Sequence, residues 1–94
     1  MNSLDHIAEK IIQEQEFIIG PLAWSEAGKV QGLNIDQDSK EVHILSSDDK
    51  AVVDALVAQY ERLFGRASHE ACRQAVVSLI ATLPASDIPT SLRV

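Results

Sequence analysis

The chain has 94 residues, 46% of them hydrophobic, and a formal net charge of −6. This length supports one hydrophobic core, so we predict a single domain over residues 1–94, which buries only about 60–65% of its unfolded surface and would gain stability by forming a homodimer. The negative charge repels phosphate groups and anionic lipids, which argues against nucleic acids and membranes as partners.

The first predicted element is an amphipathic helix that begins at Ser3. The Ser3 hydroxyl suits an N-cap, and apolar side chains recur after it at three- and four-residue steps. Gly20 can adopt the left-handed conformation that ends a helix, and Pro21 suits the first position of the next one. We expect this second, shorter helix to run to about Val30.

Two short strands, 33–35 and 42–45, come after the second helix. Between them, residues 36–41 are polar and have the composition of a hairpin turn. Because side chains alternate along a strand, His43 should point outward. The face that packs on the helices should then consist of Leu33, Ile35, Val42 and Ile44.

The third predicted helix is capped by Ser46 or Ser47 and carries an apolar stripe as far as Phe64. Asp48 and Asp49 lie near its start, where carboxylates interact favourably with the positive end of the helix dipole. The pattern therefore predicts a helix that packs one face on the core.

The fourth predicted helix begins near Ser68 and carries its apolar side chains on one face as far as Leu83. Pro84 interrupts it, because proline lacks the amide hydrogen that a helix needs. Residues 84–94 contain a further proline and isolated apolar side chains, so we expect an extended, partly ordered tail.

The helices belong to two copies of one unit, residues 3–20 and 48–65. The offset between the copies is 45 residues, the difference between positions 20 and 65. We therefore predict an α+β fold, mainly α, in which two helix–glycine–helix units pack pseudo-symmetrically and a β-hairpin bridges them (ααββαα). The paired positions are Ile7 with Val52, Glu9 with Asp54, Ile11 with Leu56, Ile12 with Val57, Glu16 with Glu61, Ile18 with Leu63, Ile19 with Phe64 and Gly20 with Gly65.

The apolar faces define a predicted core and a possible partner surface. Trp24 is the only tryptophan, and it either fills the core, which we favour, or anchors a partner. The partner surface would comprise Trp24, Leu22, Tyr60 and Phe64. The predicted core comprises Ile7, Ile11, Ile18, Leu22, Trp24, Ile35, Val42, Ile44, Val53, Leu56, Tyr60, Phe64, Cys72, Val76, Leu79 and Ile80.

His69 and Cys72 stand three residues apart on the fourth helix, a spacing that could join an imidazole and a thiolate on a metal or in a nucleophilic pair. Cys72, however, continues an apolar stripe, where a free cysteine behaves as a small hydrophobic side chain. We therefore expect a core thiol and no catalytic residue, cofactor or metal site.

Two other patterns resemble ion or acid/base sites only in part. Residues 36–41 alternate oxygen ligands like a calcium loop, but Glu41 stands where glycine is needed and Ser47 where a bidentate glutamate belongs. The carboxylates that could form a general acid/base pair fit exposed helix positions instead. These are Glu14, Glu16, Asp48 and Asp49.

Cysteine usage and the N-terminal residues predict a cytoplasmic location. The lone Cys72 forms no internal disulfide, and residues 1–6 lack the basic and apolar regions of a signal peptide. No apolar stretch approaches the roughly 20 residues of a membrane span.

A helix-turn-helix is the main alternative interpretation, centred on the second glycine junction. In that case the fourth helix would enter a major groove, but the acidic chain offers few basic side chains for phosphates. The nucleic-acid surface would comprise Arg66, Ser68, His69, Arg73 and Gln74.

The segment Phe17-Ile18-Ile19-Gly20-Pro21-Leu22-Ala23 resembles the Gly-Pro-aliphatic-Ala junction of small helical modules in bacterial and archaeal multidomain signalling proteins. The second junction, which begins at Gly65, lacks the proline. The resemblance implies an accessory regulatory or interaction module rather than an enzyme. We therefore expect a non-enzymatic module that binds another protein or a second copy of itself.

Overall fold

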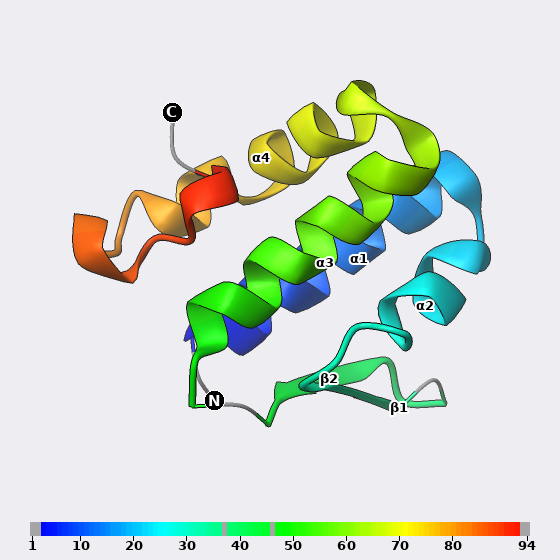
Figure 1. The fold of residues 1–94 in the computed structure, drawn as a ribbon, viewed down its shortest axis with the longest axis horizontal. Helices are drawn as coiled ribbons and strands as arrows, with labels where there is room; N and C mark the ends of the chain where they lie inside the picture. Colours follow the sequence, from blue (N-terminus) through cyan, green and yellow to red (C-terminus); the bar gives the residue numbers. More distant parts are fainter. Residues whose placement is uncertain (1–2, 37, 46, 93–94) are drawn as a thin grey trace.

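The elements of the computed structural model have the predicted order. The structure describes residues 3–36, 38–45 and 47–92. It confirms the α+β architecture, mainly helical with one antiparallel hairpin between two pairs of helices (Figure 1). The elements are α1 (Ser3–Ile19), α2 (Leu22–Ala27), β1 (Leu33–Asp36), β2 (Glu41–Ile44), α3 (Asp49–Phe64), α4 (Arg66–Ile80) and two 3₁₀ turns, η1 (Ala85–Asp87) and η2 (Thr90–Leu92).

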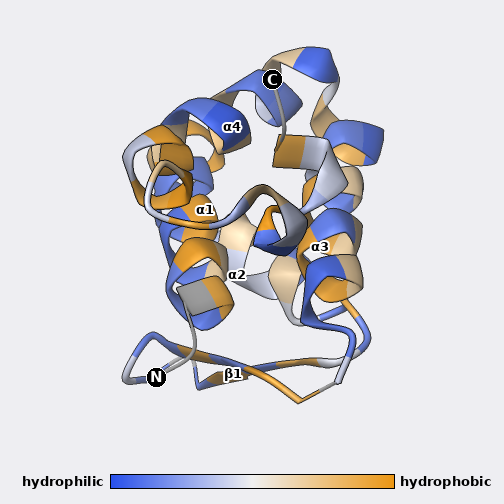
Figure 2. Ribbon diagram, turned by 90° about the vertical axis from the view of Figure 1, so that its left-hand side faces the viewer, coloured by the Kyte–Doolittle hydropathy of each residue, from blue (hydrophilic) through white to orange (hydrophobic). Residues whose placement is uncertain are grey.

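Helix α1 is the centre of the molecule. It contacts α2, α3, α4 and strand β2. The hairpin lies across one side of the helices, and the C-terminal turns lie on the other side, beside α4 (Figure 1). Hydropathy colouring shows apolar and polar residues alternating along the long helices, as expected for helices that each bury one face (Figure 2).

The first helix of each unit ends at a glycine with a positive φ. Gly20 has φ +76° and Gly65 has φ +91°, values that favour glycine. Their amides donate to equivalent carbonyls, Gly20 N to Glu16 O at 2.9 Å and Gly65 N to Glu61 O at 2.8 Å. The repeat predicted from sequence is thus matched by backbone geometry at both junctions.

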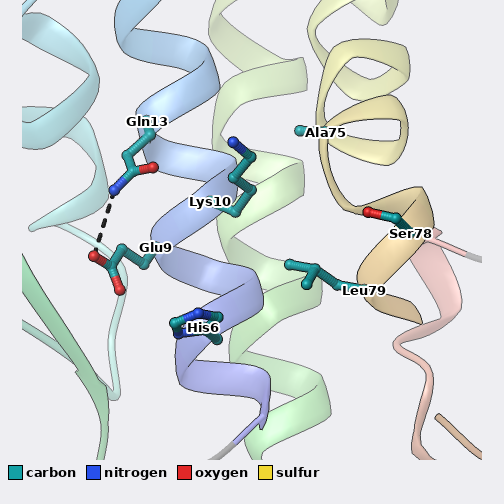
Figure 3. Close-up of a pocket in the computed structure, with 7 residues that line it drawn as sticks. All are labelled: His6, Glu9, Lys10, Gln13, Ala75, Ser78 and Leu79. Carbon is teal, nitrogen blue, oxygen red and sulfur yellow. Dashed lines mark hydrogen bonds between the residues drawn. The ribbon is translucent and has the colours of Figure 1, made fainter. Parts of the chain in front are cut away.

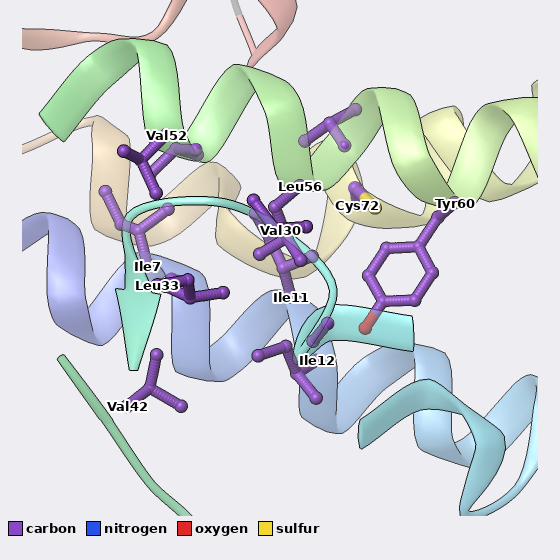
Figure 4. Packing of buried hydrophobic residues seen from close by; sticks show 14 of the residues in the cluster. Ile7, Ile11, Ile12, Val30, Leu33, Val42, Val52, Leu56, Tyr60 and Cys72 are labelled. Atoms are coloured by element: carbon purple, nitrogen blue, oxygen red, sulfur yellow. The ribbon is translucent and has the colours of Figure 1, made fainter. Parts of the chain in front are cut away.

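Burial also agrees between the two units. At three paired positions along α1 and α3, both side chains are buried. Figure 4 shows the first two of these pairs. At the pair two residues before the glycines, Ile18 and Leu63, both side chains are exposed instead. The buried pairs are Ile7 with Val52, Ile11 with Leu56 and Ile12 with Val57.

Two reciprocal hydrogen bonds join the units. Gln15 Nε2 donates to the Ser68 carbonyl at 3.0 Å, and the Tyr60 hydroxyl donates to the Ala23 carbonyl at 2.7 Å. Gln15 and Tyr60 occupy equivalent positions, since 60 − 15 = 45, and so do Ala23 and Ser68, since 68 − 23 = 45. In each unit, the side chain at the same position of the first helix therefore donates a hydrogen bond to the first turn of the other unit's second helix.

The hairpin packs on α1 as predicted. Leu33 pairs with Ile44 and Ile35 with Val42, so these four side chains share the face turned to the helices, while His43 is exposed. Asp5 Oδ1 accepts a hydrogen bond from the Ile44 amide at 3.0 Å. This bond fixes the last residue of β2 against the start of α1.

The C-terminal segment folds back on α3 and α4. Within the predicted extended, partly ordered tail, residues 85–87 and 90–92 form short 3₁₀ turns rather than extended chain. The Ser91 amide and hydroxyl both donate to Asp54 Oδ1, at 2.9 and 2.5 Å, and Leu92 is fully buried. Because these groups satisfy the backbone and bury an apolar side chain, the segment is held on the core.

Several predicted helix boundaries need correction. α2 ends at Ala27 rather than near Val30, because tighter bonds such as Val30 N to Ala27 O replace the helical pattern. α4 begins at Arg66 rather than Ser68, since Gly65 alone ends α3 and starts α4. It ends at Ile80, three residues before the predicted Leu83, because tighter bonds such as Leu83 N to Ile80 O replace the helical pattern before Pro84.

The predicted N-cap of the third helix is also corrected. Asp48 caps α3, because its carboxylate accepts a hydrogen bond from the Ala51 amide at 3.3 Å. The alternative cap Ser46 and the side chain of Ser3 lie outside the described part of the chain.

The core prediction is wrong at two positions and incomplete elsewhere. Ile18 and Leu22 are exposed, because both lie at the first glycine junction, at the end of the helical core. Among the other predicted core residues, Ile35, Ile44, Phe64 and Leu79 are only partly buried. Buried residues that the prediction omitted include Leu4, Ala8, Ile12, Ala23, Ala27, Val30, Leu33, Val52, Val57 and Leu92.

Candidate functional site

Of the four residues of the predicted partner surface, two are buried and two are at least partly exposed. Trp24 and Tyr60 are buried, so in this chain they belong to the core. Lys40 covers the indole of Trp24, with its ammonium 4.6 Å from the ring centroid. Leu22 is exposed and Phe64 is partly buried, and both lie at the glycine junctions.

Four of the six large apolar side chains that are exposed among the described residues instead lie at the end of the molecule that carries both glycine junctions; the other two are Leu45, after β2, and Val77, in the last turns of α4. Two hydrogen bonds hold the α1–α2 junction beside the α3–α4 junction, one from Gln15 to Ser68 and one from Tyr60 to Ala23. Figure 1 shows both junctions at the same end. We define the junction patch as the four exposed apolar residues within three positions of these glycines. They are Phe17 (87% exposed), Ile18 (56%), Leu22 (47%) and Leu63 (41%).

The sequence contained a signal for this patch. Ile18 and Leu63 are paired positions of the repeat, and each lies two residues before its glycine. Phe17 falls outside the apolar stripe of α1, so its exposure is consistent with helical periodicity. The pattern did not reveal that α1 and α3 extend past the point where other elements cover them.

The imidazole of His69 is fully engaged in hydrogen bonds. Its Nδ1 lies 3.0 Å from Glu61 Oε2 and its Nε2 lies 2.7 Å from the Ser91 carbonyl oxygen. A carbonyl and a carboxylate only accept hydrogen bonds, so both ring nitrogens are satisfied as donors in the imidazolium form. The Ser91 carbonyl and the Glu61 carboxylate raise the pKa of His69 above 6.5.

The structure does not bring His69 and Cys72 together as a reactive pair. The Cys72 thiol is buried and lies 3.3 Å from Gln15 Nε2. Burial raises the pKa of Cys72 to about 12, so the thiol stays protonated and is a poor nucleophile or metal ligand. Among the described residues, no cluster of His, Cys, Asp or Glu has the arrangement of a metal site.

The hairpin turn with the partial calcium-loop pattern is closed on itself. Asp36 Oδ1 accepts from the amides of Asp38 and Ser39 at 3.0 and 3.3 Å. These hydrogen bonds lower the pKa of the Asp36 carboxyl below its ordinary value. The carboxylate therefore stabilises the turn, as in an Asx turn.

The alternative nucleic-acid surface is broken up by burial and ion pairing. Ser68 is buried, and Arg73 is paired with Glu70 at 2.7 Å. His69 faces Glu61 and Ser91, which leaves Arg66 and Gln74 as the exposed members of the set. Two exposed polar side chains are a small share of the contacts that a recognition helix makes.

A shallow groove of about 220 Å³ runs along the seam between α1 and α4 (Figure 3). Its α1 side is polar, and Glu9 and Gln13 on this side are joined by a hydrogen bond of 3.4 Å. The mixture of side chains resembles an ordinary helix seam more than an apolar ligand pocket. The groove is lined by His6, Glu9, Lys10, Gln13, Ala75, Ser78 and Leu79.

Comparison with family models, curated proteins and solved structures finds no match to this chain. The resemblance to signalling modules therefore stays a prediction. In the part of the chain that the structure describes, no helix combines the length and apolar character needed to cross a bilayer.

Proposed function

We propose that this chain is a non-enzymatic interaction or regulatory module whose partner binds the junction patch. The observation that carries the proposal is the concentration of exposed apolar side chains at one end of a small acidic protein. Large apolar side chains that are grouped on a surface commonly mark protein-binding sites, and aromatic residues contribute most to such interfaces. Phe17, almost fully exposed, is the natural anchor of this patch.

The state of the polar groups supports a binding role over catalysis. Cys72 is a buried, protonated thiol, and both nitrogens of His69 are occupied by structural acceptors. The free thiol fits a reducing compartment, and we propose the cytoplasm. The Gly-Pro junction, through its resemblance, favours a role within signalling proteins.

Affinity purification with matched surface variants tests the proposal. We expect the tagged chain and a Val77→Ser variant to retain the same bound proteins, whereas Phe17→Ser combined with Leu22→Ser should lose them. Val77 is a fair control, because it is 55% exposed on the last turns of α4, away from the junctions. If the double variant retains every partner of the wild-type chain, the junction patch is not the binding surface.

A further inference from the structure

The junction patch repeats the internal symmetry of the chain. Ile18 and Leu63 are equivalent positions, and both remain exposed while the equivalent positions one or two turns earlier, such as Ile11 and Leu56, are buried. The apolar stripes of α1 and α3 thus both continue beyond the part of the core that this chain covers. Ile18 and Leu63 are the one pair that the patch repeats, because Phe17 and Leu22 of the first unit correspond to Arg62 and Ala67 of the second.

The free charges that the two units carry beside the patch have opposite signs. The first unit carries Glu14 and Glu16 in the last turns of α1, and the second carries Arg62 and Arg66 at the end of α3 and the start of α4. None of these four side chains forms an ion pair with any described residue; Arg62 donates only to the neutral amide of Gln59. The other acidic residues nearby are already engaged, Glu61 by His69 and Glu26 by Lys29 and Gln59.

From this arrangement we infer that the partner of the junction patch is a second copy of this chain. The inference rests on the proposed function and names its partner. In a two-fold dimer the same surface is used by both copies, so the surface must be complementary to itself. A two-fold axis that sets the first unit of one copy against the second unit of the other satisfies this condition.

This arrangement pairs groups that form no ion pair within the described part of one copy, although Arg62 attracts Glu26 at longer range. Glu14 and Glu16 of one copy meet Arg62 and Arg66 of the other, on both sides of the axis. Phe17 and Arg62 occupy equivalent positions of the two units, since 62 − 17 = 45, and this arrangement sets the units that carry them against each other. Arginine over an aromatic face is a favourable contact.

A purely basic partner fits this surface less well. The net charge of −6 attracts cations to the molecule as a whole. At the junction patch, however, two arginines balance the two free glutamates, so a uniformly basic surface would meet like charge on half of its area. A partner that carries both positive and negative charges, arranged as in this chain, places an opposite charge against the arginines and against the glutamates.

The test uses two charge-reversal variants of the whole chain. The first combines Glu14→Arg with Glu16→Arg, and the second combines Arg62→Glu with Arg66→Glu. We expect the wild-type chain to dimerise between about 1 μM and about 1 mM, and each variant alone to raise the dimer Kd at least about 100-fold through like-charge repulsion. An equimolar mixture of the two variants should dimerise again, because every reversed group then faces an opposite charge.

Sedimentation velocity measures these states, and a charge-matched control separates the patch from net charge. Asp38→Arg with Glu41→Arg changes the net charge as much as the first variant does but lies on the hairpin, so it should dimerise like wild type. Phe17→Ser should raise Kd about 30-fold or more.

Three results would overturn the inference: a wild-type chain that stays monomeric to about 1 mM, variants that dimerise as well as wild type, or a mixture that does not dimerise. The proposed function fails separately. If the wild-type chain is monomeric but loses a different protein on Phe17→Ser with Leu22→Ser, the patch binds another partner and only the second-copy inference falls.

Discussion

The two helix–glycine–helix units share their first helices and differ in the segments after the glycine. α1 and α3 have 17 and 16 residues and bury equivalent positions. After the glycine, α2 has only 6 residues and leads into the hairpin, whereas α4 has 15 and leads into the 3₁₀ turns. The comparison indicates that the core is built by the repeated helices and that the differences lie in the elements that cover them.

The covering elements nonetheless attach in a similar manner. On α1, the Asp5 carboxylate accepts from the backbone amide of Ile44 in the hairpin. On α3, the Asp54 carboxylate accepts from the backbone amide of Ser91 in the C-terminal turns. Each first helix thus holds the segment after its own unit by a carboxylate-to-amide bond, although the segments differ in structure.

Truncation of paired core residues is the strongest test of this comparison. Ile11→Ala and Leu56→Ala should each lower the free energy of unfolding by about 2–5 kcal/mol, because each leaves a cavity at a fully buried site. Urea denaturation followed by Trp24 fluorescence measures both. Ile18→Ala and Leu63→Ala, at exposed positions, should change the free energy of unfolding by no more than about 0.5 kcal/mol. Strongly unequal costs for Ile11 and Leu56 would mean that the units are not equivalent.

The two glycines sharpen the comparison at the junctions. A Cβ at either position meets no heavy atom within 4 Å, so the cost of substitution is backbone strain alone. Gly65, with φ +91° and ψ −179°, lies in a region that is essentially restricted to glycine, so Gly65→Ala and Gly65→Asn should each cost about 1–3 kcal/mol. Gly20→Asn should cost less, because asparagine tolerates the left-handed φ of +76°. Equal costs for the two asparagine variants, measured by urea denaturation, would contradict this distinction.

Helix and strand identities could be predicted from the sequence because they depend on local patterns. The 3.6-residue periodicity of α1 and α3 and the alternation around Val42 are properties of short segments, and the structure confirms them. The repeat also located Gly20 and Gly65 as helix ends. These features need no knowledge of the surfaces on which the helices pack.

The exposed and polar features could not be read in the same way. Ile18 has the position of a core residue on its helix, and its exposure depends on how far the neighbouring helices reach. Gln15 is a polar residue on the buried face of α1, and its bond to Ser68 depends on the distance between two units far apart in sequence. The docking of Leu92 likewise depends on tertiary contacts rather than on a local pattern.

The reciprocal hydrogen bonds are expected to differ in energy although they are equivalent in position. Tyr60→Phe should cost about 0.5–1.5 kcal/mol, since it removes one buried hydrogen bond from a well-packed ring. Gln15→Met should cost less, because Gln15 Oε1 is buried and accepts no hydrogen bond from a described residue, so removing it offsets part of the loss. Urea denaturation of both variants measures the difference, and a larger cost at Gln15 would show that its Oε1 does have a partner.

The smallest expected effect is the pH dependence of the second unit. His69 and Trp24 are equivalent positions, since 69 − 24 = 45, but only His69 titrates, and its partners Glu61 and Ser91 raise its pKa above 6.5. A raised pKa in the folded state means that protonation stabilises the fold. This contribution is fully present below the unfolded value near 6.5 and disappears as the pH rises through the raised pKa of the folded state.

Urea denaturation across pH, compared between wild type and His69→Gln, isolates this contribution. At acidic pH, the free energy of unfolding of the wild-type chain should exceed that of His69→Gln by up to about 1 kcal/mol. This difference should vanish at pH values above the raised pKa of His69. Glu61→Gln serves as a second variant, because it removes the carboxylate that requires a proton on Nδ1 of His69. Like His69→Gln, it should make the free energy of unfolding depend less on pH than in the wild-type chain. A difference that grows with rising pH would contradict the imidazolium assignment, and with it the role of His69 in holding the C-terminal turns to α3 and α4.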